Sequence, residues 1–242
     1  MANAAYTESY LAFRQRCLAA FTPENRVERA GLRPVEQQFE EFTLRTVFYE
    51  AMLPNCAVHG SDCRLFKNGR EVFSWQSVNN DGDFYRLIHH QNSRRYLVFR
   101  QDLYGYSVLS LADFSLFQYF PKESWPENSE KFHETFIWTD VSYSAETGLL
   151  AVAGCFWAAP MEVVCLPFDE PMAEHWPWMM LRDALSDDVP FAGFEPDDDI
   201  LLVGWQPNGS LRLSVGTVDG KRLLVDCRIS EDGRRVLALT VI

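Results

Sequence analysis

Long apolar runs and clusters of basic residues are both missing from this sequence. No run approaches the roughly 18 apolar residues that a membrane-spanning helix needs, so no membrane segment is expected. Lys and Arg number 22 against 34 Asp and Glu, which gives a formal net charge of −12. Because a polyanion repels phosphate groups, we expect neither nucleic acid nor an anionic membrane as a partner.

The amino terminus lacks the features of an export signal. The first eight residues hold no basic group, and Glu8, Arg14 and Arg16 interrupt any apolar core that a signal peptide would need. We therefore expect a cytoplasmic protein, in which the cysteines remain free thiols. The six cysteines are widely spaced, at Cys17, Cys56, Cys63, Cys155, Cys165 and Cys227.

Familiar catalytic motifs are also missing. There is no G-x-S-x-G turn, no G-x-G-x-x-G loop and no Walker A loop, which excludes the usual hydrolase nucleophile and the usual phosphate cradles. His133 and Glu134 begin like the zinc motif H-E-x-x-H, but Ile137 stands where the second histidine belongs. No cofactor is predicted.

What the sequence does hold is a large share of apolar and aromatic residues, 47% and 14%. From about residue 40 onward these residues form short runs separated by Gly, Asn and Asp. The Asn68-Gly69 pair between two such runs predicts a tight hairpin, because both positions accept a positive φ. The pattern predicts an all-β fold, mainly antiparallel, over residues 40–242. A Pro-rich insertion at 169–199, with a short helix at 178–185, interrupts it.

The first 22 residues predict a helix, with an aromatic stripe along residues 4–21. Its members recur every three or four residues, which places them on one face. We expect this face to pack on the β body, the alternative being a dimer contact. Residues 23–39 are polar and contain Pro23, Gly31 and Pro34, so we interpret them as a linker. The whole chain is interpreted as a single domain. The stripe consists of Tyr6, Tyr10, Phe13, Cys17 and Phe21.

An irregular repeat is present in the β region. A turn precedes a Leu- and Val-rich strand near Asn92, Gly148, Gly209 and Gly233. Counting strands gives three to four units of four strands, and such units are typical of β-propeller blades. The prediction is therefore a propeller-like or two-sheet architecture.

Two patches of the sequence carry a resemblance to known proteins. One is Arg100–Tyr106 (RQDLYGY), and the other is Phe136–Asp140 followed by Gly154–Pro160 (GCFWAAP). Over roughly residues 63–172 the chain resembles a group of uncharacterised bacterial cytosolic proteins, a resemblance that implies no activity. The rhythm of turns and strands loosely resembles WD40-type propeller blades, which implies architecture alone. The Trp-Asp and Gly-His pairs of that family are missing.

Polar and aromatic residues interleave near the same patches and predict a cleft. Asp102 and Asp140 are the candidate carboxylate pair for acid–base or glycosidic chemistry, with His89 or His90 as a base. On a strand these adjacent histidines point to opposite faces, so at most one of them can enter the cleft. The alternative is that Asp102 caps its turn, Asp140 bonds a neighbouring strand, and the tryptophans fill the core. The candidate binding residues of this cleft are Tyr104, Trp138 and Trp157.

Cys56, His59 and Cys63 form a second candidate site. Two thiolates and an imidazole could hold zinc if a fourth ligand such as Asp62 joined them, although the spacing matches no standard knuckle. The alternative is ordinary packing of these residues. The acidic run Glu195–Asp199 is interpreted as a solvated loop.

The Trp176–Met180 segment is the third candidate. Trp176 and Trp178 with two methionines are either an exposed partner site or a lid over the sheet. Our first functional prediction is a non-catalytic interaction or scaffold protein that contacts another protein through this segment. The second is a small-molecule-binding protein or hydrolase using the Asp102–Asp140 cleft, and the third is a zinc-stabilised domain.

Overall fold

Strands arranged in four sheets make up most of the chain. The computed structural model describes residues 2–28, 31–52, 57–78, 84–124, 134–175, 178–187, 193–195 and 197–242. Over these residues it contains 17 strands, two α-helices and one short 3-10 helix, η1 (Lys122–Ser124). Every pairing between strands is antiparallel, so the predicted fold class is confirmed.

Two strands of the first sheet lie within residues 23–39. The prediction that these residues form a linker was therefore wrong. Residues 23–39 contain two strands that pair with opposite ends of the same long neighbour. Edge strands with solvated faces need no apolar alternation, so their polar composition concealed them. The sheet consists of β1 (Arg26–Glu28), β2 (Val35–Phe39), β3 (Phe42–Met52), β4 (Ala57–Lys67) and β5 (Arg70–Val78).

The other three sheets are simple meanders of four consecutive strands. The second is β6 (Tyr85–His89), β7 (Arg95–Phe99), β8 (Tyr106–Ser110) and β9 (Leu116–Tyr119). The third is β10 (Ile137–Ser144), β11 (Leu149–Cys155), β12 (Glu162–Pro167) and β13 (Met179–Met180). The fourth is β14 (Ile200–Trp205), β15 (Leu211–Gly216), β16 (Arg222–Ile229) and β17 (Val236–Val241).

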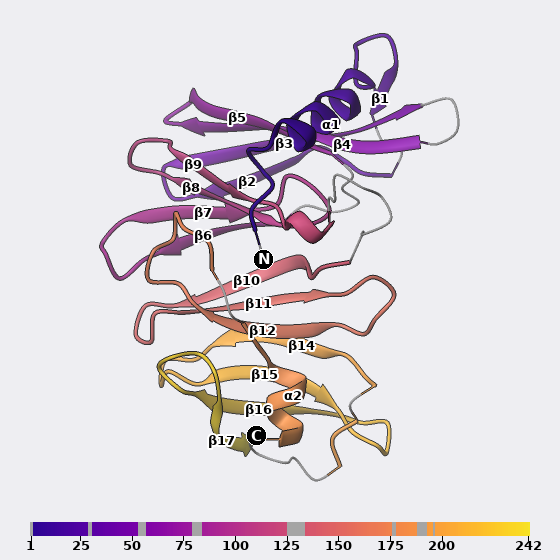
Figure 1. Cartoon of the computed structure of the whole chain (residues 1–242). Helices are drawn as coiled ribbons and strands as arrows, with labels where there is room; N and C mark the ends of the chain where they lie inside the picture. Colours follow the sequence, from indigo (N-terminus) through magenta and orange to yellow (C-terminus); the bar gives the residue numbers. More distant parts are fainter. Residues whose placement is uncertain are drawn as a thin grey trace.

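The four sheets stack in chain order, as propeller blades do (Figure 1). The first and the fourth sheets lie at opposite ends of the stack, so the described blades form an open row. The architecture is therefore propeller-like without a closed ring.

Separate apolar layers fill the spaces between successive sheets, and the middle strands serve two layers at once. On β11, Leu150 and Val152 pack toward the second sheet, whereas Leu149 and Ala151 pack toward the fourth. This alternation follows from the two-residue period of a strand. It explains why the strands of the middle sheets are buried on both faces and read as nearly continuous apolar runs.

Helix α1 (Glu8–Ala19) packs on the β body as the aromatic stripe predicted. Tyr10 is fully buried and its ring lies 4.4 Å from that of Phe120. The helix begins later than predicted because the Thr7 side chain caps it at the Tyr10 N–H, and Ala4 before it bonds to the Phe120 carbonyl. Tyr6 departs from the stripe, with its side chain largely exposed.

The Pro-rich insertion adds a strand and a helix to the third sheet. Met179 and Met180 form β13, which pairs with β12, and α2 (Leu181–Asp187) follows directly. The helix therefore begins three residues later than the predicted span 178–185. Neither helix of the described chain has the length and apolar content that crossing a bilayer requires.

Candidate functional site: a groove across three sheets

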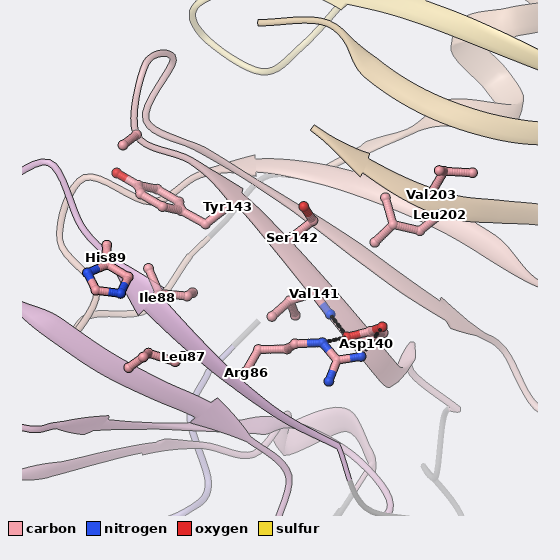
Figure 2. A pocket seen from close by; sticks show the side chains of 11 residues that line it. Arg86, Leu87, Ile88, His89, Asp140, Val141, Ser142, Tyr143, Leu202 and Val203 are labelled. Carbon is pink, nitrogen blue, oxygen red and sulfur yellow. Dashed lines mark hydrogen bonds and ion pairs between the residues drawn. The ribbon is translucent and has the colours of Figure 1, made fainter. Parts of the chain in front are cut away.

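A groove runs across the first strands of the second, third and fourth sheets (Figure 2). Strands β6 and β14 each contact β10, so the three lie next to one another. The groove encloses about 490 Å³ and combines charged, hydroxyl and aliphatic side chains. Its lining residues are Arg86, Leu87, Ile88, His89, Asp140, Val141, Ser142, Tyr143, Ala145, Leu202 and Val203.

Two β-bulges shape the groove. The pairing of β10 with β11 shifts between Trp138 and Asp140, and the pairing of β14 with β15 shifts between Leu202 and Gly204. A bulge bends its strand and re-aims the side chains beside it. Asp140 and Val203 therefore enter the groove at positions that regular strands would not give them.

Glycine and tryptophan fix the position of β14 against β10. Gly204 has a φ of 126°, and an added Cβ would lie 3.3 Å from the Ser142 hydroxyl. The Trp205 indole N–H donates to the Ser142 carbonyl at 3.0 Å. Residues with a side chain rarely adopt a φ of 126°, so glycine at position 204 suits this close approach of the third and fourth sheets.

The central charged feature of the groove is the ion pair of Arg86 and Asp140. Arg86 Nε lies 2.7 Å from Asp140 Oδ1, and its terminal nitrogen lies 2.7 Å from Oδ2. The Val141 N–H also donates to Oδ1 at 2.7 Å. The two side chains remain 45% and 37% exposed, so the pair is accessible from the groove while joining the second sheet to the third.

His89 and His90 occupy opposite faces of the chain, as strand alternation predicted. His89 lines the groove, and its Nε2 lies 3.1 Å from Glu40 Oε1 in the turn between β2 and β3. His90 is buried, with Nε2 2.8 Å from the Phe168 carbonyl and Nδ1 accepting from the Asn92 N–H. His90 is thus a structural residue with both ring nitrogens engaged.

Asp102 lies outside this groove and is buried in the turn between β7 and β8. The Tyr10 hydroxyl donates to its Oδ2 at 3.2 Å, and the Leu103 N–H donates to its Oδ1 at 2.8 Å. Burial raises the pKa of Asp102 to about 6, although the neighbouring Arg14 acts in the opposite direction. The Asp102 side chain fastens α1 to the sheets and does not line the groove that holds Asp140.

The predicted cleft is therefore wrong as a single site. Tyr104 packs in the small cluster around Tyr10 and Phe120. Trp138 is buried and stacks on Tyr106 at 4.3 Å. Trp157 is 60% exposed and follows β11, in the turn to β12. The interleaved polar and aromatic residues predicted one shared surface. In the structure, the bulge in β10 and the turns after β7 and β11 place these side chains in different surroundings.

The zinc prediction gains no support from the described residues. His59 Nε2 pairs with Glu50 Oε2 at 3.3 Å, and the buried Cys63 sulfur lies 3.2 Å from the Tyr85 hydroxyl. Cys56 lies outside the described residues. Within the part of the chain that the structure describes, no group of three or more His, Cys, Asp or Glu side chains is placed to hold a metal ion.

The Trp178–Met180 part of the third candidate is a lid over the core and not an exposed surface. The Trp178 ring lies 5.5 Å from that of Phe136, Met179 is buried, and Met180 packs against the same core layer. Strand pairing with β12 holds the segment down. Trp176 lies outside the described residues.

Several groove residues carry no signal that sequence reasoning could use. Arg86 and Asp140 are 54 residues apart, and a single arginine near the start of a strand has the pattern of a solvated side chain. Ser142 and Tyr143 have the pattern of ordinary strand residues, and Glu40, the partner of His89, has that of a turn residue. The sequence also carries no signal of the bulge in β10.

Comparison with known proteins assigns no function to the groove, which is therefore interpreted from its own residues. No family model matches the chain, and a search of curated proteins found no match. A solved structure, that of a bifunctional GH43-CE protein of Bacteroides eggerthii, is similar over 90% of this chain with 10% identity and a TM-score of 0.37. The similarity covers 26% of that protein, so this chain spans about a quarter of its length. Fold and groove together define a class: an open row of antiparallel β blades with a charged groove across three of them.

Proposed function

We propose that this protein is a non-catalytic interaction module that binds a segment of a partner protein in the groove across β6, β10 and β14. The observation that carries the proposal is the accessible Arg86–Asp140 pair, held by strands of two different sheets and flanked by aliphatic side chains. Binding sites combine a few placed polar groups with an apolar lining, and rigid strands hold both in position.

The polar groups of the groove favour recognition over catalysis. Asp140 accepts three hydrogen bonds from Arg86 and Val141, and His89 pairs with Glu40. A general base needs a lone pair aimed at a substrate proton or at a nucleophile. Here the Asp140 carboxylate faces Arg86 and the Val141 N–H, and His89 Nε2 faces Glu40, which suits a fixed charge pattern that a partner recognises.

The groove also indicates the chemistry of the partner segment. An exposed guanidinium and a carboxylate side by side offer both donors and acceptors, and Leu202 and Val203 offer apolar contact. A peptide segment with an acidic and an aliphatic side chain near each other fits this combination. The expectation that the protein is cytoplasmic and binds no nucleic acid, and the resemblance to bacterial cytosolic proteins, stay predictions beside this proposal.

Affinity capture with matched variants tests the proposal. Wild-type protein, Arg86→Ala and Arg45→Ala are immobilised and exposed to lysate of the host. Arg45 pairs with Glu36 at 2.8 Å on the exposed face of the first sheet and does not line the groove. We expect a protein captured by wild type and Arg45→Ala to be lost with Arg86→Ala. Its purified form should bind about tenfold or more weakly to Arg86→Ala.

Thermal unfolding of each variant provides the control for folding. A partner list that is the same for all three proteins would contradict the proposal, as would equal affinities of the purified partner. If Arg45→Ala alone failed to capture the partner, the binding surface would lie on the first sheet and not in the groove.

A further inference from the structure

A second cavity lies beside α1 and has no lining residue in common with the groove across β6, β10 and β14. It encloses about 530 Å³ between α1, β4, β5 and β9. Arg14 and Leu18 line it from the helix, residues 73–76 from β5 and Leu116 from β9. Its volume lies within the range of sites that hold small molecules. We call it the α1–β5 cavity.

One wall of the α1–β5 cavity is aromatic and rigid. Phe73 and Trp75 are two residues apart on β5, so their side chains lie on the same face of the sheet. Their ring centroids are 5.9 Å apart, and that of Trp75 is 4.3 Å from the ring centroid of the fully buried Phe99. Leu116 packs against the same apolar layer. A wall that is already fixed by the core can hold an apolar ring without further ordering.

The edge of β5 adds backbone groups to the cavity. The Val78 N–H donates to the Gln101 carbonyl at 2.9 Å, so it points away from β4. The Gln76 carbonyl accepts from Arg14 and points the same way. Because backbone direction alternates along a strand, the N–H of Ser74 also points away from β4. Ser74 lines the cavity, so a bound molecule can accept a hydrogen bond from its N–H.

The uncompensated charge in the α1–β5 cavity is positive. Asp62 is the one acid among the described residues that line it, and both of its oxygens are engaged. Oδ2 accepts from Arg26 at 2.9 Å, and Oδ1 accepts from Gln76 at 2.7 Å. The Arg64 side chain is 61% exposed and lies 4.0 Å from Glu71, a separation at which an exposed ion pair contributes little. The Arg64 guanidinium is therefore accessible to an anion.

The net charge of −12 does not exclude a small anion from this cavity. At physiological ionic strength, charges farther away than about 8 Å are largely screened. The lining residues themselves include two arginines, Arg14 and Arg64, against Asp62, and the charge of Asp62 is balanced by Arg26. The local charge therefore favours an anion although the whole chain is acidic.

We propose that the α1–β5 cavity is a second binding site, which takes a small aromatic carboxylate. Arg64 and Ser74 are opposite each other in the pairing of β4 with β5, so guanidinium and backbone N–H can bind one carboxylate. The aromatic ring of the ligand lies on the wall of Phe73 and Trp75, reached around the edge of β5. The indole N–H of Trp75 is buried and has no acceptor among the described residues, as expected where an acceptor arrives with a ligand.

A ligand titration followed by NMR tests the proposal, with phenylacetate as the probe. Phenylacetamide, which has the same ring and no charge, is the matched ligand. Phenylacetate should shift the resonances of the Ser74 amide and the Trp75 indole N–H, and should bind about tenfold or more tightly than phenylacetamide. Arg64→Gln should remove most of this preference. Arg228→Gln replaces an exposed arginine of β16 that does not line the cavity, and should preserve it.

Spectra that are otherwise unchanged establish that both variants are folded. Equal binding of the two ligands would overturn the proposal, and so would unshifted resonances of Ser74 and Trp75 at phenylacetate concentrations on the order of 10 mM. Shifts confined to the residues around Arg86 would place the ligand in the groove and would also overturn it. Because the two sites have no residue in common, a negative result here leaves the proposed peptide binding in the groove unaffected.

Discussion

At the residue scale, Asp102 is a buried carboxyl group with a raised pKa. It bonds to Tyr10 and to the Leu103 N–H, yet burial raises the pKa of its carboxyl group to about 6. A raised pKa means that the folded state favours the protonated acid. Its contribution to stability is therefore complete below its ordinary pKa of 3.8 and is lost as the pH rises through about 6.

The first prediction is that Asp102→Asn flattens the pH dependence of stability. Between about pH 4 and 7, the wild type should lose on the order of 2–3 kcal/mol relative to this variant. The neutral amide has no charge to desolvate and keeps an acceptor for the Leu103 N–H. Urea unfolding at a series of pH values measures the difference. Parallel pH profiles for the two proteins would show that Asp102 is not the group responsible.

At the scale of elements, a buried ion pair joins α2 to β12. Arg182 Nε lies 3.0 Å from Glu162 Oε2, and its guanidinium also donates to the carbonyls of Met161 and Asp198 at 3.0 and 3.1 Å. Glu162 is almost fully buried, and this burial raises the pKa of its carboxyl group. The pair thus ties the helix, the strand and the segment before β14 together.

The second prediction concerns the removal of one partner of the Arg182–Glu162 ion pair. Arg182→Met should cost about 3–5 kcal/mol at neutral pH, because it leaves a buried carboxylate without its partner. The double variant Glu162→Gln/Arg182→Met should recover part of that loss, since no buried charge remains. Chemical denaturation measures both.

Arg45→Met is the comparison for an exposed pair, which should cost about 0–1 kcal/mol. Because protonation removes the charge of Glu162, the defect of Arg182→Met should also shrink as the pH is lowered. A defect that is the same at pH 5 and pH 8 would show that lost packing, and not the unpaired charge, explains it.

At the scale of the whole molecule, each of the three large apolar layers formed by the described residues lies between two neighbouring sheets, and the row of described blades is open (Figure 1). A fold of this kind behaves as a linear array, in which stability is a sum of units and of contacts between neighbours. A destabilising substitution in a sheet at one end of the row should therefore promote local unfolding of that end more than of the other.

The third prediction follows from this linear arrangement. Leu213→Ala, in the layer between the third and fourth sheets, should cost about 2–5 kcal/mol and reduce amide protection mainly in β14–β17. Leu44→Ala, in the layer between the first and second sheets, should reduce it mainly in β3–β5. Hydrogen exchange of the two variants makes the comparison. Equal loss of protection in all four sheets would mean that the row unfolds as one unit.

The sequence by itself determined the class of fold and its local turns. Runs of β-branched and aromatic residues have few conformations other than strands that bury them, and Asn68-Gly69 adopts the positive φ values, 50° and 79°, that a tight hairpin requires. The stripe around Tyr10 likewise determined which face of α1 is buried. These features depend on local conformational preferences, so a short stretch of sequence is enough to predict them.

Only the tertiary structure decided the site. Whether Asp102 or Asp140 faces solvent depends on the bulge in β10 and on the partner that each finds across the stack, Tyr10 for one and Arg86 for the other. Those partners are 92 and 54 residues away along the chain. A bulge and a contact between distant strands arise from packing of whole sheets, for which no local sequence window has a signal.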